Sequence, residues 1–352
     1  MAYHGRAIVL ALRLHPDRHL RVHDEAAPEP GPGEAMIRVT AVGLCGSDRH
    51  WIVDGGIGDA RLEAPLVLGH EFAAVAETGQ YRGRLVAADP AVPCQRCGPC
   101  LRGAANLCLD LRFAGHGRTD GALREFVAWP ERCLLPLSEA VSDAEAAIVE
   151  PLAVAVHAMD LAGSVDGATV SVVGCGPIGL LLVALARAGG ASTVAATDPL
   201  RHRLDAATAF GATDVREATP SGDERAALLA SIPGPGYDIA FDVSGEAAAV
   251  ETAVQVTGPG ATVVLVGIPS DDRTTFGAST ARRKGLTLKL SRRSTPAAFQ
   301  RAVELADGRS LGLERLVTLR VPLREATTGF DSLVARDGLK VIVEPGAGRG
   351  SP

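Results

Sequence analysis

A run of 20 residues without a charged side chain, 167–186, constrains the fold of this chain more than any other feature. Twenty apolar residues in a helix are long enough to cross the ~30 Å hydrocarbon core of a membrane. This run, however, has Gly174, Gly176, Pro177 and Gly179 at its centre. A β-branched segment, a glycine turn and a leucine-rich segment predict a buried strand, a tight turn and a helix. We therefore expect no membrane association.

The alternation of strand and helix continues through the second half of the chain. The pattern predicts strands at 168–173, 192–197, 237–243 and 261–266, and helices at 178–188, 201–210 and 246–256. Strands that alternate with helices form right-handed crossovers and a parallel sheet. We therefore predict a doubly wound α/β domain over residues 156–289.

The remaining residues have a different texture. Residues 1–155 contain short alternating apolar runs among segments rich in proline and glycine, which predicts an antiparallel β domain. Residues 290–352 are too few for a third domain, and we expect their helix at 296–306 and two β segments to complete the first one. A length of 352 residues suits two domains.

Charge and the N-terminal residues exclude several classes of partner. The chain has 35 basic and 41 acidic side chains, a net charge of −6, and no basic block that would hold a phosphate backbone, so we expect no nucleic acid partner. The apolar run at 7–12 is ended by Arg13 and is too short for an export signal. The expected location is the cytoplasm.

The glycine turn has the sequence and context of a dinucleotide-binding motif. The predicted ligand-binding positions are Gly174, Gly176, Pro177, Ile178 and Gly179. The glycines allow a tight turn, close approach of a pyrophosphate and packing of helix on strand, and the helix N-terminus attracts the phosphates. A turn without a ligand is the alternative reading of such a short motif.

Asp198 supports the prediction of a nucleotide site at the glycine turn. It lies 19 positions after Gly179, at the end of the second predicted strand, where a carboxylate accepts hydrogen bonds from ribose and repels a 2′-phosphate. NAD is therefore favoured over NADP. Arg203 completes the predicted cofactor set, although Arg201 and Arg203 are also close enough to serve a 2′-phosphate.

Seven cysteines, an odd number, argue against a disulfide framework. Four of them are crowded into fifteen residues, as Cys94, Cys97, Cys100 and Cys108. Four thiolates at this spacing suit a closed tetrahedral zinc with no position for substrate, and reduced thiols fit a cytosol. The predicted role of this site is structural.

A second candidate metal site is dispersed along the chain. Its members are Cys45, His70 with the adjacent Glu71, and Glu150. One cysteine, one histidine and one or two carboxylates match a catalytic zinc that keeps an open position. Taken singly, Cys45 would more often be a buried apolar residue, His70 a turn residue and Glu150 a solvated helix end.

Together these motifs closely resemble the zinc-dependent medium-chain dehydrogenases, and most of all their sorbitol and polyol dehydrogenase branch, with threonine dehydrogenases as near relatives. The resemblance covers essentially the whole chain and rests on Cys45-Gly-Ser47-Asp48 with His50, Gly69-His70-Glu71, the four-cysteine segment, Glu150-Pro-Leu and the glycine turn. It implies a GroES-like β-rich catalytic domain, completed by the C-terminal residues, and a Rossmann NAD-binding domain.

The resemblance also implies roles for individual residues. Cys45 and His70 would bind the catalytic zinc, and Glu71 and Glu150 would bind it directly, through water or alternately. Ser47 and His50 match the proton-relay positions of the family. Further candidates for substrate contact are Trp51, Arg292 and Arg293, of which Trp51 stands where polyol dehydrogenases often have tyrosine.

The implied activity is reversible hydride transfer between NAD and a secondary alcohol of a polyol, sugar or cyclitol. Two zinc ions per chain and a homodimer or homotetramer are expected. One alternative is an L-threonine-type amino alcohol dehydrogenase, for which Arg292 or Arg293 would supply only half of the substrate pocket. The other is a catalytically silent relative that binds zinc and nucleotide.

Overall fold

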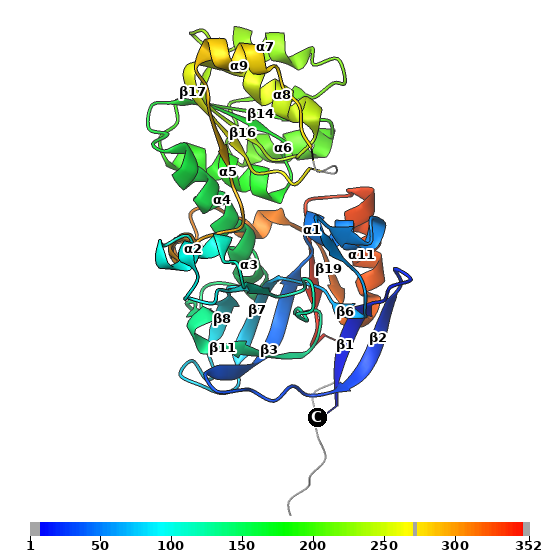
Figure 1. Cartoon of the computed structure of the whole chain (residues 1–352). Coiled ribbons are helices and arrows are strands. Elements are labelled where there is room, and N and C mark those ends of the chain that lie inside the picture. The colour runs from blue at the N-terminus through cyan, green and yellow to red at the C-terminus, as the bar shows by residue number, and fades with distance from the viewer. Residues whose placement is uncertain (1–7, 270–272, 348–352) are drawn as a thin grey trace, which may run out of the picture. The chain divides into compact units, whose positions relative to one another are not determined.

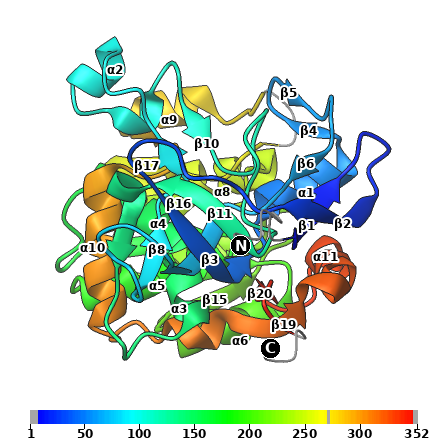
Figure 2. The same cartoon turned by 90° about the horizontal axis from the view of Figure 1, so that it is seen from below.

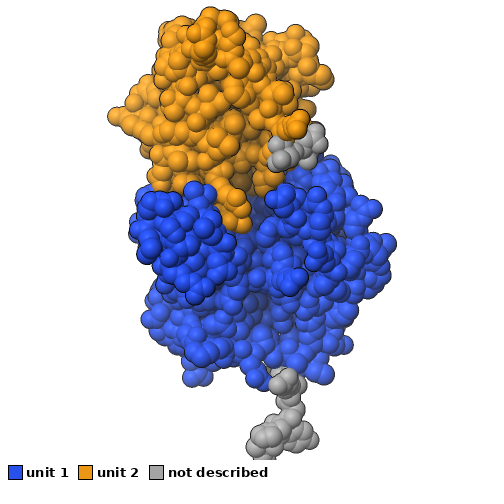
Figure 3. Space-filling view, in the orientation of Figure 1, with its two compact units in different colours: residues 1–150, 295–352 blue, residues 151–294 orange. Residues whose placement is uncertain are grey.

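The computed structural model describes residues 8–269 and 273–347. They fold into two compact units (Figure 3). Unit 1 takes in residues 1–150 and 295–352, and unit 2 takes in residues 151–294. The chain thus leaves unit 1 at Glu150 and returns to it at Thr295.

Unit 2 is built on a six-stranded sheet in the order β15-β14-β13-β16-β17-β18, with every neighbouring pair parallel (Figure 1). The strands are β13 (Thr169–Val173), β14 (Thr193–Asp198), β15 (Asp214–Glu217), β16 (Tyr237–Asp242), β17 (Thr257–Leu265) and β18 (Thr287–Leu290). In chain order this is the 3-2-1-4-5-6 arrangement of a Rossmann domain, whose strand order reverses between β13 and β16. The predicted doubly wound fold is confirmed.

Helices accompany this sheet in unit 2, and most of them contact its strands. They are α4 (Val149–Ala162), which begins with the last two residues of unit 1, α5 (Pro177–Ala188), α6 (Arg201–Ala209), α7 (Glu224–Ala230), α8 (Ala247–Val256) and α9 (Ala278–Lys284). In α5, Pro177 occupies the first turn, where its missing N–H costs nothing, and Leu180 to Val183 are fully buried. Packing of α5 on β13 and β14 fixes the turn that precedes the helix.

Two strands of unit 2 were not predicted, and one was predicted too short. The edge strands β15 and β18 are four residues long and mostly half-buried, so neither shows a clear apolar run. Strand β17 begins at Thr257 rather than 261 and includes Gly258 and Gly260, which normally indicate a turn. A register shift in its pairing with β16 accommodates these residues.

Unit 1 contains a mostly antiparallel sheet in the order β12-β8-β7-β3-β20-β19, with β11 also paired to β3 (Figure 1). The strands are β3 (Glu34–Gly43), β7 (Glu71–Ala76), β8 (Leu85–Ala88), β11 (Phe126–Pro130), β12 (Leu134–Pro136), β19 (Val317–Pro322) and β20 (Lys340–Glu344). Because β20 pairs with β3, the C-terminal segment completes the sheet begun by the N-terminal one. The C-terminal segment therefore returns to this sheet.

Smaller elements surround the large sheet of unit 1. The further strands are β1 (Ile8–Leu14), β2 (Leu20–Ala26), β4 (Gly56–Ile57), β5 (Ala60–Arg61), β6 (Leu66–Val67), β9 (Ala91–Val92) and β10 (Arg112–Phe113). The helices are α1 (Gly46–Val53), α2 (Gly98–Leu101), α3 (Asp143–Ala147), α10 (Pro296–Asp307) and α11 (Ala326–Ala335), with short 3₁₀ turns at Ala105–Leu107, Glu131–Cys133, Leu313–Leu316 and Leu323–Glu325. Figure 2 shows α2 standing out from the strands of the large sheet.

The core of unit 1 joins both chain segments, because Ile37, Phe72, Leu123, Phe330 and Val343 belong to one buried cluster.

Among the residues that the structure describes, no helix combines the length and apolar character needed to span a bilayer.

Candidate active site

Cys45 lies at the N-terminal end of α1, where the chain leaves β3. Its backbone N–H donates to Asp48 Oδ2 at 2.9 Å, so the first turn of α1 fixes the position of the cysteine. His70 and Glu71 follow Gly69, whose φ is +90°. A Cβ on Gly69 would lie 2.7 Å from a methyl carbon of Val42, so this turn requires glycine.

The structure brings Cys45, His70 and Glu71 together from these two segments. These three residues are called the Cys45 group below. One ligand atom of each residue lies within 4.8 Å of the others, and His70 and Glu71 are buried. A thiol, an imidazole and a carboxylate are the donor set of a catalytic zinc, and three protein donors leave a fourth position open. The residues present therefore fit this metal.

Asp48 lies behind His70, on the side away from Ser47. Its carboxylate is fully buried, and its Oδ1 lies 3.7 Å from His70 Nδ1 without a hydrogen-bond partner. His70 Nε2 lies 3.4 Å from Ser47 Oγ. A carboxylate on one ring nitrogen leaves the other nitrogen available as a metal ligand.

Glu71 has a partner that the sequence analysis missed. Lys340 Nζ lies 2.9 Å from Glu71 Oε1 and 2.6 Å from Oε2, and it donates to the carbonyl of Leu44 at 3.0 Å. Both side chains are almost completely buried, with 2% and 1% exposure. A lysine on a buried strand was the available signal, since the chain has only three lysines.

Glu150 is buried at the start of α4. Within the part of the chain that the structure describes, the atoms within 4.8 Å of one another belong to Cys45, His70 and Glu71 and do not include a Glu150 oxygen. Burial raises the pKa of Glu150 to about 8, while the positive charge of His70 opposes this rise. Glu150 is therefore electrostatically coupled to the Cys45 group. The carboxylate that lies with Cys45 and His70 is that of Glu71.

The helix α1 also carries His50 and Trp51. His50 Nδ1 lies 2.7 Å from Asp54 Oδ2, one helical turn further along. Trp51 is buried, and its ring lies 5.5 Å from that of His116 in an edge-on contact. The ring of Phe113 lies 5.5 Å from that of His70. Aromatic side chains thus form a wall next to the Cys45 group.

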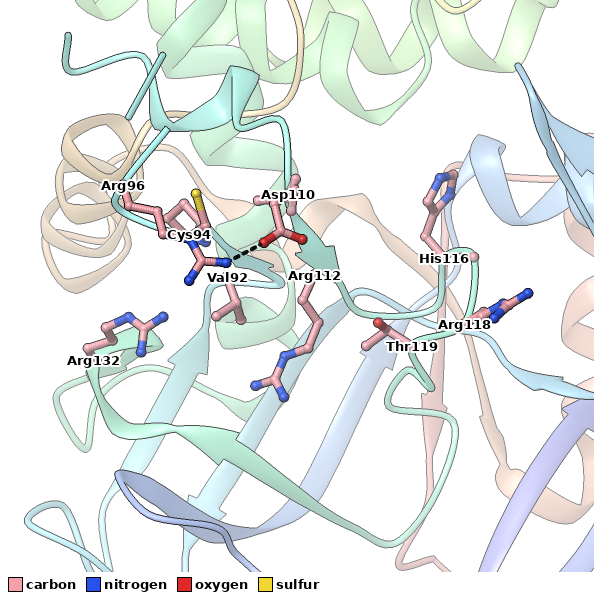
Figure 4. Close-up of a pocket in the computed structure, with 12 residues that line it drawn as sticks. Val92, Cys94, Arg96, Asp110, Arg112, His116, Arg118, Thr119 and Arg132 are labelled. Carbon is pink, nitrogen blue, oxygen red and sulfur yellow. Dashed lines mark hydrogen bonds and ion pairs between the residues drawn. The ribbon is translucent and has the colours of Figure 1, made fainter. Parts of the chain in front are cut away.

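His116 also lines a surface pocket of about 580 Å³ in unit 1 (Figure 4). Its lining residues include four arginines, Arg96, Arg112, Arg118 and Arg132, and one carboxylate, Asp110. Arg96 pairs with Asp110 at 3.1 Å, the contact drawn in Figure 4, and Arg112 pairs with Glu34 at 2.9 Å. The pocket borders Cys94 and contains no member of the Cys45 group.

The four crowded cysteines converge in the structure. The sulfur atoms of Cys94, Cys97, Cys100 and Cys108 lie within 4.8 Å of one another. Hydrogen bonds from backbone N–H groups, first that of Leu109, lower the pKa of Cys97 to about 6. Four sulfur donors fit a closed tetrahedral zinc site. Cys133 and Cys175 are buried free thiols.

The glycine turn lies at the carboxyl end of β13. Gly174 has φ of +102°, and a Cβ on Gly179 would lie 1.9 Å from the Gly174 carbonyl oxygen, so the protein itself requires both glycines. Gly176 differs, because a Cβ there would meet only Arg203, at 3.9 Å. Space at the first turn of α5, beside Pro177 and Ile178, fits a pyrophosphate at a helix N-terminus.

Asp198 lies at the carboxyl end of β14 and is 3% exposed. Its carboxylate accepts hydrogen bonds from the N–H groups of Cys175 at 2.8 Å and Leu200 at 2.9 Å, which ties it to the glycine turn. Arg203 Nη1 lies 3.9 Å from Asp198 Oδ2, whereas Arg201 pairs with Asp205 at 3.0 Å. Of the two arginines, Arg203 is the one next to Asp198.

Arg292 and Arg293 follow β18 in unit 2, so they belong to a different unit from Trp51. Arg292 is exposed. Arg293 is half-buried and has φ of +56°, a left-handed conformation that is uncommon for a residue with a side chain.

Comparisons with known proteins agree with this arrangement. Residues 31–139 match the alcohol dehydrogenase GroES-like domain, and residues 177–308 match the zinc-binding dehydrogenase family. The chain is 35% identical over 335 residues to the D-xylulose reductase A of Aspergillus niger, with 92% of this chain and 93% of the relative covered. It is 36% identical over 334 residues to a probable D-xylulose reductase A of Aspergillus terreus, with 92% and 94% covered.

Solved structures give the same result. The L-idonate 5-dehydrogenase of Escherichia coli superimposes with a TM-score of 0.89 at 26% identity, covering 96% of this chain and 98% of that one. The galactitol-1-phosphate dehydrogenase of Escherichia coli superimposes with a TM-score of 0.86 at 27% identity, covering 96% and 100%. The resemblance seen in the sequence is thereby confirmed. The chain belongs to the zinc-dependent medium-chain dehydrogenases, in their sorbitol-like branch of polyol and sugar dehydrogenases.

Proposed function

We propose that this chain transfers hydride reversibly between NAD and a secondary alcohol of a polyol, sugar or cyclitol. The observation that carries the proposal is the convergence of Cys45, His70 and Glu71 from two separate segments. When bound, zinc supplies a Lewis acid for the substrate hydroxyl, and NAD supplies the hydride acceptor. Residues 1–155 and 290–352 would form the catalytic domain, and residues 156–289 the NAD domain.

The residues around the metal ligands hold charge and move a proton. Lys340 balances the buried charge of Glu71, and Asp48 keeps one face of His70 toward the metal. Glu150, buried nearby and coupled to His70, is the alternative carboxylate ligand. Ser47 Oγ, 3.4 Å from His70 Nε2, would receive the substrate proton, and His50 would pass it to water.

We propose two zinc ions per chain. The group formed by Cys45, His70 and Glu71 has mixed donors and suits the reacting metal, whereas the four thiolates of Cys94 to Cys108 suit a structural one. Loss of the second zinc would loosen the loop around α2 without removing a group that contacts substrate.

NAD rather than NADP is the proposed cofactor. The buried carboxylate of Asp198 lies at the end of β14 and would repel a 2′-phosphate. Arg203 is close to Asp198, and Arg201 is paired elsewhere, so neither is an uncommitted cation.

The substrate class follows from the relatives, whose names specify D-xylulose, L-idonate and galactitol 1-phosphate. Trp51, next to His116, would contact the substrate carbon chain, and Arg292 or Arg293 would contact its hydroxyl groups. We also propose a cytoplasmic homodimer or homotetramer. The open edge strand β18, on which Leu290 is 78% exposed, is a suitable surface for pairing with a second copy.

A panel of polyols, sugars, cyclitols and L-threonine, followed by NADH absorbance with NAD⁺ and then NADP⁺, tests this proposal. We expect turnover of at least one polyol, sugar or cyclitol with NAD⁺, loss of that turnover after treatment with a chelator, and its return with Zn²⁺. Turnover of L-threonine alone would replace the proposal with an amino alcohol dehydrogenase. No turnover of any compound by protein with two bound zinc ions would support the silent relative.

A further inference from the structure

His50 has a carboxylate partner on its own helix. Asp54 follows it by four residues, which places both side chains on one face of α1, and their Nδ1 and Oδ2 atoms are 2.7 Å apart. The His50 side chain is 20% exposed and that of Asp54 is 52% exposed. The contact therefore joins a half-buried imidazole to a carboxylate that faces solvent.

The stability of α1 does not explain this carboxylate. Asp54 is the residue that caps the C-terminal end of the helix, where the backbone dipole disfavours a negative charge. A cation is already present at this end, because Arg18 Nη1 donates to the carbonyl of Val53 at 2.7 Å. The local feature that favours an acceptor here is the ring of His50.

We propose that Asp54 is a positioning residue that prepares His50 for proton transfer. This inference rests on the proposed function, in which His50 receives the substrate proton after Ser47. By accepting the Nδ1–H hydrogen bond, Asp54 favours the tautomer whose Nε2 carries a free lone pair. The arrangement has the logic of a histidine held by an aspartate in acyl-transfer enzymes.

The proton balance is simple. One proton arrives at His50 Nε2 and one proton leaves Nε2 for water, while the Nδ1–H group keeps its hydrogen bond to Asp54. Asp54 remains ionised throughout, and His50 returns to the same tautomer. Without Asp54, part of the neutral His50 population carries its proton on Nε2 and cannot accept another there.

A double-mutant cycle separates this role from a structural one. We expect Asp54→Ala to lower kcat for alcohol oxidation on the order of tenfold with KM unchanged, which is below the full effect of a lost general base. In the His50→Gln background the same substitution is expected to have no further effect on kcat. Added imidazole, a diffusible proton acceptor, is expected to restore part of the rate lost in Asp54→Ala.

Asp59→Ala is the matched control, because Asp59 is also an exposed aspartate shortly after α1, and it is expected to leave kcat unchanged. Equal losses from Asp54→Ala in both backgrounds, or no loss in either, would overturn the inference while leaving the relay intact. A wild-type kcat for His50→Gln would overturn the relay itself, and the role of Asp54 with it.

Discussion

The buried ion pair between Lys340 and Glu71 gives a sharp test of how the active site is held together. Replacement of Lys340 by methionine keeps most of the side-chain volume and removes the ammonium group. Because Glu71 is 1% exposed, its carboxylate would then remain buried without a positive partner in the zinc-free protein. The carbonyl of Leu44 would also lose its hydrogen bond.

Removal of one member of a buried pair typically costs about 3–5 kcal/mol, because the remaining charge keeps its desolvation penalty. For the zinc-free protein we therefore predict a urea midpoint lower by roughly 2 M. Both tryptophans of the chain, Trp51 and Trp129, belong to unit 1, so their fluorescence reports the unfolding of the unit that contains the pair.

Two further variants make the result decisive. Lys340→Met with Glu71→Gln removes the orphaned charge, and we expect most of the stability to return. Arg82→Met removes an exposed positive charge from the same unit, and its effect is expected to stay within about 0.5 kcal/mol. A Lys340→Met variant as stable as Arg82→Met, or no recovery in the double variant, would refute this reasoning.

Three further predictions concern the nucleotide site and a buried carboxyl group. Gly179→Ala should destabilise unit 2, because its Cβ would lie 1.9 Å from the Gly174 carbonyl oxygen. Gly176→Ala should instead leave the urea midpoint unchanged and raise the Kd for NADH, measured by fluorescence titration. Asp198→Ala should shift the ratio of kcat/KM values toward NADP⁺ by about tenfold or more, and an unchanged ratio would exclude Asp198 as the selecting group. Burial raises the pKa of the Asp89 carboxyl to about 7, above its value in the unfolded chain. As pH rises from about 4 to 7, Asp89 therefore ionises in the unfolded state before it does in the folded state, and the free energy of unfolding falls. Asp89→Asn should therefore increase the free energy of unfolding at pH 8, by about 1.4 kcal/mol per unit of pKa shift, and should have little effect at pH 4. Equal effects at both pH values would contradict this prediction.

Local signals were sufficient for the centre of the Rossmann unit and for grouping the four crowded cysteines, whereas Cys45, His70 and Glu71 were joined only through the family resemblance. The glycine turn, the helix that begins at Pro177 and the strand that ends at Asp198 each occupy a short segment whose pattern has one plausible structure. The same holds for the four cysteines between 94 and 108. These features need no knowledge of distant contacts.

The features that were missed depend on contacts between distant or polar segments. Lys340 meets Glu71 across 269 positions of sequence, and its place on an apolar strand marks it as unusual without identifying its partner. Asp54 lies at an exposed helix end, where an aspartate is unremarkable until its contact with His50 is seen. The N-terminal β2 alternates between exposed and half-buried positions, so it has no strong apolar period, and its pairing with β1 was not predicted.

Zinc content and initial rate, measured together on the Cys45→Ser and Cys97→Ser variants, test the central claim most directly. That claim is that the group of Cys45, His70 and Glu71 holds the reacting metal. The account predicts two zinc ions per chain in the wild type, and one zinc ion with no measurable turnover in a folded Cys45→Ser variant. It predicts lost stability, with residual turnover in the protein that remains folded, for Cys97→Ser. A Cys45→Ser variant that keeps wild-type turnover would contradict the claim.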